Sequence, residues 1–182
     1  MPLPKLNEAQ VEWIIQQVAA YIERQRQFFR HTASPLDANQ RAAMRPFFPP
    51  PTLDLARVVV VSGERVSNPP FYRQLVEMGF ERAGLPNFEH MAAITFVDTV
   101  VSHEPFTDRL LFHELVHVVQ YERLGVAEFA AKYVTGFLGG GNYEAIPLEM
   151  NAYQLDGRFA SEPAKAFSVA SEVLAWADAR RF

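Results

Sequence analysis

Hydrophobic residues recur at helical spacing near the start of the chain. Five of them fall on one face of a helix: Val11, Ile14, Ile15, Val18 and Ile22. Asn7 precedes this run, and Gln10 follows Asn7 by three residues, which is the spacing of a capping box. The pattern predicts an amphipathic helix that begins after Asn7 and reaches about Phe29.

Shorter elements are expected over the following ninety positions. The pattern predicts a short helix over 37–44, a buried strand over 57–61, a second short helix over 72–78, and a strand-rich stretch over 91–101 with a bend or hairpin at 97–99. The string Pro-Phe-Phe-Pro-Pro-Pro at 46–51 should be neither helix nor central strand. Because Phe47 and Phe48 are strongly apolar, we expect this string to wrap over the core in an ordered form.

The composition becomes helical beyond Pro105. Helices are predicted over 107–124, 126–137, 147 to about 159, and 164–180, separated by Gly125, by 139–142 and by 161–163. A helix, a small sheet and a helical half in this order predict an α+β fold in a single domain. Residues 1–50 would form an N-terminal helical cover, 51–102 the sheet region, and 103–182 the half that carries the site.

Composition narrows the classes of function. The chain has 182 residues, a formal charge of −4 and no cysteine, which excludes disulfides, cysteine-bound metals and thiol nucleophiles. Mild acidity without a dense basic run argues against nucleic acid or a membrane as partner. No stretch is apolar enough to span a bilayer, and the first thirty residues lack the pattern of a secretory signal, so a cytoplasmic location is expected.

One motif carries chemistry: residues 113–117 read His-Glu-Leu-Val-His, which is HExxH within a predicted helix. At about 100° per residue, His113 and His117 lie about 40° apart on one face, so both imidazoles can reach one ion. Glu114 lies about 100° further round, at the edge of the same site. Two neutral imidazoles leave the coordination of zinc incomplete, so a third ligand is required.

The third ligand should come from a later helix that folds back over the first. We expect Glu149, because the glycines at 139–141 let the chain reverse and Pro147 then begins a helix with Glu149 in its first turn. Glu144, just before that helix, is the alternative. One position on the ion would remain for water, and Glu114 is the natural base to take a proton from it.

The segments HELVHVVQY and YEAIPLEMNAY together resemble the zincin metallopeptidases, specifically the gluzincin group and small bacterial zincin-like domains. The resemblance covers roughly 92–159 and implies zinc on His113, His117 and Glu149, with Glu114 as catalytic base. It also implies a peptide or protein substrate extended along the 92–97 strand. Gluzincins often carry an aspartate four residues after the ligand glutamate, where this chain has Tyr153; Asp156, one turn further along, could orient a metal-binding histidine instead.

Several other polar residues are open to two interpretations. Tyr143 and Tyr153 could donate hydrogen bonds to a developing oxyanion, although packing is the commoner role of such tyrosines. His103 could reach the mouth of the cleft, although a surface position is the commoner one, and His31 and His90 have no partner pattern.

These patterns favour a zinc-dependent hydrolase of the peptidase type. The alternatives are a zincin-like domain that binds metal or a partner without proteolysis, and a metal-free helical interaction module. Nothing in the sequence specifies an oligomeric state.

Overall fold

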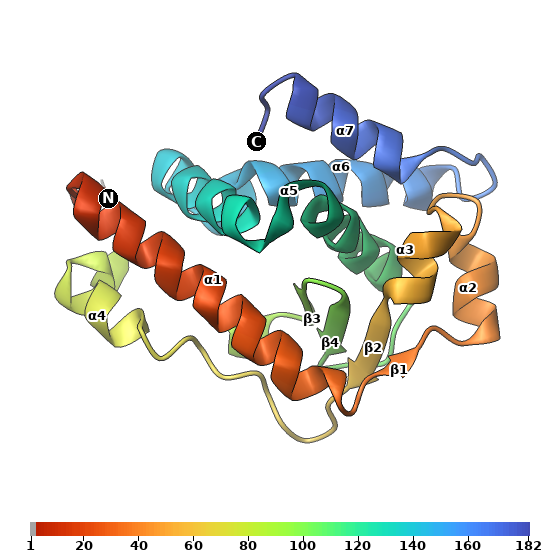
Figure 1. Cartoon of the computed structure of the whole chain (residues 1–182), viewed down its shortest axis with the longest axis horizontal. Coiled ribbons are helices and arrows are strands. Elements are labelled where there is room, and N and C mark those ends of the chain that lie inside the picture. The colour runs from red at the N-terminus through yellow and green to blue at the C-terminus, as the bar shows by residue number, and fades with distance from the viewer. Residues whose placement is uncertain (1–2) are drawn as a thin grey trace.

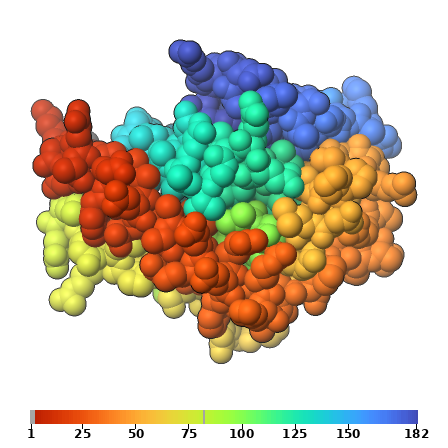
Figure 2. Space-filling model, in the orientation of Figure 1, coloured from red at the N-terminus to blue at the C-terminus, as the bar shows by residue number. Residues whose placement is uncertain are grey.

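The computed structural model describes residues 3–182 and arranges helices around a small sheet (Figure 1). Helix α1 (Glu8–Arg30) runs beside α5 along one face of the molecule, as the neighbouring red and turquoise surfaces of Figure 2 show. The Asn7 side chain accepts a hydrogen bond from the Gln10 backbone, and the Gln10 side chain accepts one from the Asn7 backbone. The predicted capping box and first helix are confirmed.

The sheet has the strand order β1-β2-β4-β3, with β1 at Ser34–Pro35, β2 at Arg57–Val60, β3 at Ala93–Phe96 and β4 at Thr99–Ser102. β2 and β4 are parallel, and the other pairs are antiparallel. Of the bend and the hairpin predicted as alternatives at 97–99, the structure has the hairpin: β3 and β4 pair, and their turn contains Val97 at φ 62°. The prediction that β2 is buried was wrong, because β1 pairs only with Arg57 and Val58 and leaves Val60 exposed.

Three short α-helices precede β3 in the chain. α2 (Ala38–Met44) and α4 (Tyr72–Glu77) lie where the sequence predicts them. α3 (Pro50–Leu55) contradicts the expectation that the proline string contains no helix. Pro50 and Pro51 occupy the first helical positions, where the backbone N–H has no partner within the helix, so proline is tolerated there. Phe47 and Phe48 are buried, which confirms the ordered wrap.

Helix α5 (Asp108–Gly140) is interrupted at Gly125 (φ 72°), so its two parts correspond to the two helices predicted there. α6 (Pro147–Ser161) follows, and α7 (Val169–Asp178) is shorter than the predicted 164–180 helix. Ser168 caps α7, and the Val169 N–H donates a hydrogen bond to the Phe47 carbonyl. The chain at the start of α7 is therefore held against the segment that contains Phe47, and the helix does not extend back to residue 164. No helix within residues 3–182 has the length and apolarity needed to cross a membrane.

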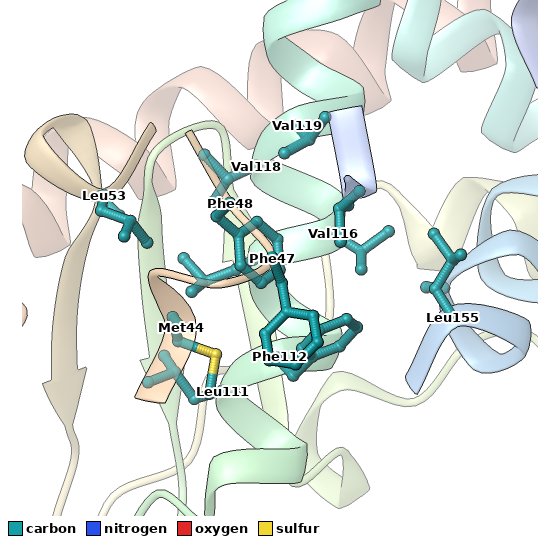
Figure 3. Packing of buried hydrophobic residues seen from close by; sticks show 14 of the residues in the cluster. Met44, Phe47, Phe48, Leu53, Leu111, Phe112, Val116, Val118, Val119 and Leu155 are labelled. Atoms are coloured by element: carbon teal, nitrogen blue, oxygen red, sulfur yellow. The ribbon is translucent and has the colours of Figure 1, made fainter. Parts of the chain in front are cut away.

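The first part of α5 lies at the centre of the core rather than at its surface. Every residue from Leu111 to Tyr121 is buried, so both the apolar face and the histidine face of this helix are covered. On the apolar side, the Phe112 ring stacks on Phe159 with centroids 4.5 Å apart, and Phe47 and Phe48 close around it (Figure 3). The molecule is an α+β fold with a mainly helical C-terminal half.

Candidate metal centre

Three buried side chains converge on one point between α5 and α6. The Nε2 atoms of His113 and His117 are 3.3 Å apart, and Glu149 Oε2 lies 3.6 Å from the first and 3.4 Å from the second. Each of the three residues is less than a tenth exposed. The structure places Glu144 in a short 3-10 turn with an exposed side chain, so Glu149 is the carboxylate that joins the histidines.

These separations fit a single cation. Donors held at about 2.1 Å from a common tetrahedral centre lie about 3.4 Å from one another, which matches all three observed distances. Glu149 Oε2 is buried and has no hydrogen-bond partner among the described residues, although buried polar atoms are normally satisfied. The His113, His117 and Glu149 group could therefore hold a metal ion.

Each histidine is oriented by a partner on its other ring nitrogen. His113 Nδ1 lies 2.8 Å from Asp156 Oδ2, and His117 Nδ1 lies 2.8 Å from Gln120 Oε1. Because both partners present oxygens, each Nδ1 is the donor in its hydrogen bond, and each Nε2 faces the cluster. The structure thus places Asp156 beside a histidine of the motif.

Gln120 also ties the two helices of the site together. Its Nε2 donates to the Leu148 carbonyl and to Asn151 Oδ1, each at 3.0 Å. One buried amide therefore orients His117 and holds the α6 turn that carries Glu149. This role is not among the predictions from the sequence, although the spacing of three residues from His117 to Gln120 puts both on one helical face.

Two glycines allow α6 to begin close against the end of α5. A Cβ added to Gly136 would lie 2.6 Å from Pro147 Cδ, and one added to Gly140 would collide with Ala145. Gly141 (φ 76°) ends α5 in the left-handed conformation that starts the reversal. The glycine-rich stretch at 139–142 thus reverses the chain, as expected, and Gly136 and Gly140 permit the close packing that brings Glu149 to the histidines.

The carboxylates and imidazoles of the site shift one another's pKa values. Burial would lower the pKa of His113, but the Asp156 and Glu149 carboxylates more than offset this and raise it to about 10. Burial likewise disfavours the charged form of His117, and Glu149 raises the pKa of that imidazole. Burial would raise the pKa of Glu149, but His117 and His113 hold it well below its usual range. The centre therefore favours positive charge on or between its imidazoles.

Glu114 is held by the edge strand. Glu114 Oε2 accepts a 2.7 Å hydrogen bond from the hydroxyl of Thr95, which lies in β3. That hydroxyl also lies 3.1 Å from the Glu114 carbonyl oxygen, so Thr95 fixes the helix and the carboxylate together. The other carboxylate oxygen is not engaged by any residue in the described part of the chain, and Glu114 lines the space around the cluster.

Two hollows meet at Glu114 and Tyr143. One is a largely aromatic cavity of about 80 Å³ beneath α1, which reaches His117 and Glu149. The other is an open groove of about 460 Å³, which reaches His113 and is bordered by the chain entering β3. The cluster of His113, His117 and Glu149 therefore lies between an outer groove and an inner apolar cavity.

The two candidate tyrosines and the three other histidines lie at different distances from the site. Tyr143 lines both hollows, and Tyr153 is 47% exposed with its ring centroid 4.7 Å from that of His113. His103 reaches neither hollow: its Nε2 accepts from the Val66 N–H and its Nδ1 bonds the Met91 carbonyl, so it fastens a loop to the sheet. His31 is exposed, whereas His90 lines the open groove.

Comparisons of this chain with protein-family models, with curated proteins and with solved structures gave no match. Its function is therefore argued from the site.

Proposed function

We propose that this protein is a zinc-dependent hydrolase of the peptidase type. Two imidazoles and one carboxylate are a ligand set typical of catalytic zinc, which leaves the fourth position open. The observation that carries the proposal is the buried His113, His117 and Glu149 cluster, with the orphaned Glu149 oxygen, beside Glu114. A structural zinc site would have four protein ligands, whereas the described residues supply three.

In this proposal Glu114 is the general base. A bound zinc ion would supply a water of lowered pKa and a Lewis acid for the substrate carbonyl. Thr95 holds one oxygen of Glu114, which leaves the other to take the proton and later pass it to the leaving amine. Thr95 also lies in the strand that borders the groove, so the same residue links the base to the place where a substrate would lie.

Substrate binding would use the edge of β3. Among the described residues this strand pairs with β4 alone, and the chain entering it lines the open groove. An extended peptide could therefore add along its unpaired edge where that edge meets the groove. The aromatic cavity beside His117 is smaller than the roughly 300–1,000 Å³ of pockets that take a whole small molecule, which fits a single apolar side chain of that peptide.

Tyr143 and Tyr153 are the candidate donors to an oxyanion. Burial and the Glu149 charge raise the pKa of Tyr143, and the same two causes raise the pKa of Tyr153. Both hydroxyls therefore keep their protons at neutral pH and can donate to negative charge that develops on a substrate.

The test compares wild type with Glu114→Gln and His113→Ala. Metal content is measured by elemental analysis after purification without chelator, and hydrolysis is measured on a peptide library. We expect stoichiometric zinc and cleavage for wild type, zinc with activity lowered at least about a hundredfold for Glu114→Gln, and neither for His113→Ala.

Other outcomes would contradict specific parts of the proposal. Zinc in wild type without any cleavage would favour a non-proteolytic metal-binding domain. Protein without metal would favour a helical interaction module. Cleavage by Glu114→Gln at the wild-type rate would remove Glu114 from its assigned role.

A further inference from the structure

Arg109 projects a cationic group into the open groove beside the metal centre. Its side chain is 60% exposed, whereas that of its partner Asp156 is only 5% exposed. The Nη2 and Nε atoms donate to the single oxygen Asp156 Oδ1 at 2.8 and 3.3 Å. Of the five N–H groups of a guanidinium, the other three have no partner within the described residues.

The position of this guanidinium is set relative to the reaction centre. Asp156 receives Arg109 on one oxygen and His113 on the other, so the arginine is anchored to a metal-binding histidine. Along α5, Arg109 precedes His113 by four residues, which is about 6 Å of helix axis. An extended peptide covers that length in about two residues.

We propose that Arg109 binds a carboxylate of the substrate about two residues from the bond that is cleaved. A guanidinium presents planar, paired donors that match a carboxylate, and Arg109 lines the groove together with His113 and Glu114. Both carboxylate oxygens of the nearly buried Asp156 are already bonded, one to Arg109 and one to His113, so Asp156 holds the arginine in place. This inference rests on the proposed function and adds a class of substrate to it: peptides with a free C-terminus or an acidic side chain at that distance.

The experiment measures binding without turnover, so that it is read separately from catalysis. The zinc-loaded Glu114→Gln protein is titrated calorimetrically with three short peptides of otherwise identical sequence: one with a free C-terminal carboxylate, one with a C-terminal amide, and one amidated peptide with an internal glutamate. We expect the best carboxylate peptide to bind at least about tenfold more tightly than the plain amide. The stronger of the two carboxylate peptides identifies the source of the carboxylate.

The same titrations are repeated after adding Arg109→Gln, Arg109→Lys, or the control Arg73→Gln, which removes an exposed arginine of α4. We expect Arg109→Gln to abolish the preference for carboxylate while changing binding of the amide less than threefold, Arg109→Lys to restore part of the preference, and Arg73→Gln to change nothing. Zinc affinity is measured for each variant.

Three results would overturn the inference. The protein that retains Arg109 could bind all three peptides equally, or it could bind none of them. Alternatively, Arg109→Gln could weaken zinc and all peptides alike, which would make Arg109 only a positioning residue for Asp156. Failure of the hydrolase proposal would give a different result. The wild-type protein would then cleave no peptide, but it would still bind the carboxylate peptides more tightly than the amide.

Discussion

Replacing Gly136 with alanine should weaken metal binding even though this residue touches no metal ligand. The added Cβ would lie 2.6 Å from Pro147 Cδ, whereas ordinary contacts begin near 3.4 Å, so the start of α6 must move by about 0.8 Å. Glu149 is two residues further along α6. Because metal–ligand distances tolerate changes of only about 0.2 Å, we expect the zinc Kd to rise about tenfold or more.

Gly139→Ala is the matched control. It lies three residues away in the same helix and has open space around it. Both changes improve intrinsic helix propensity by about 1 kcal/mol, so only the contact with Pro147 separates them. Zinc affinity is measured by competition with a chromophoric chelator, and the fold is checked by urea unfolding of the metal-free proteins. Equal zinc affinity in the two variants would refute the link between this contact and the position of Glu149.

Three further predictions concern a carboxylate that contacts a motif histidine, a buried aromatic ring of the core, and a buried aspartate paired with two arginines. Asp156→Asn should weaken zinc binding about 10–100-fold in the same chelator competition, while Asp178→Asn, at an exposed carboxylate of α7, should not. Phe112→Ala should lower the free energy of unfolding by about 3–5 kcal/mol in urea titrations, against less than about 0.5 kcal/mol for Phe28→Ala, which is 70% exposed; equal costs would contradict the packing described. Burial would raise the pKa of Asp98, but Arg26 and Arg30 lower it overall, so its stabilising contribution is present above about pH 4 and is lost as the pH falls further. Urea titrations from pH 7 to pH 2 should show that Asp98→Asn lacks this acid-dependent part, and parallel pH profiles would contradict it.

Local patterns were sufficient for most of the helices. The capping box at Asn7, the break at Gly125 and the proline that begins α6 each act within one or two turns, so their effect can be read from neighbouring residues. One error arose where a distant contact decided the outcome. Residues 164–168 are not helical because the chain before Val169 packs on Phe47, and that contact spans most of the sequence.

The candidate site shows the same division. The spacing of His113 and His117 implies that their imidazoles share a helical face, and the structure brings Glu149 to them. Arg109 and Gln120 escaped notice, although both lie one turn from a motif histidine. Their roles depend on partners in α6, Asp156 for the first and Asn151 for the second, and helical spacing does not reveal which side chains of another helix lie opposite.

The order of residues alone determines which residues share a face of the histidine helix, where that helix breaks, and that the chain turns at 97–99. These features depend on interactions between near neighbours. Packing of α1, α5 and α6 around the sheet was needed to bring one carboxylate within 3.6 Å of two imidazoles, to place Thr95 on Glu114, and to form the cavity and the groove. Such features join segments up to a hundred or more residues apart, and their geometry results from the mutual fit of many buried side chains rather than from any local pattern.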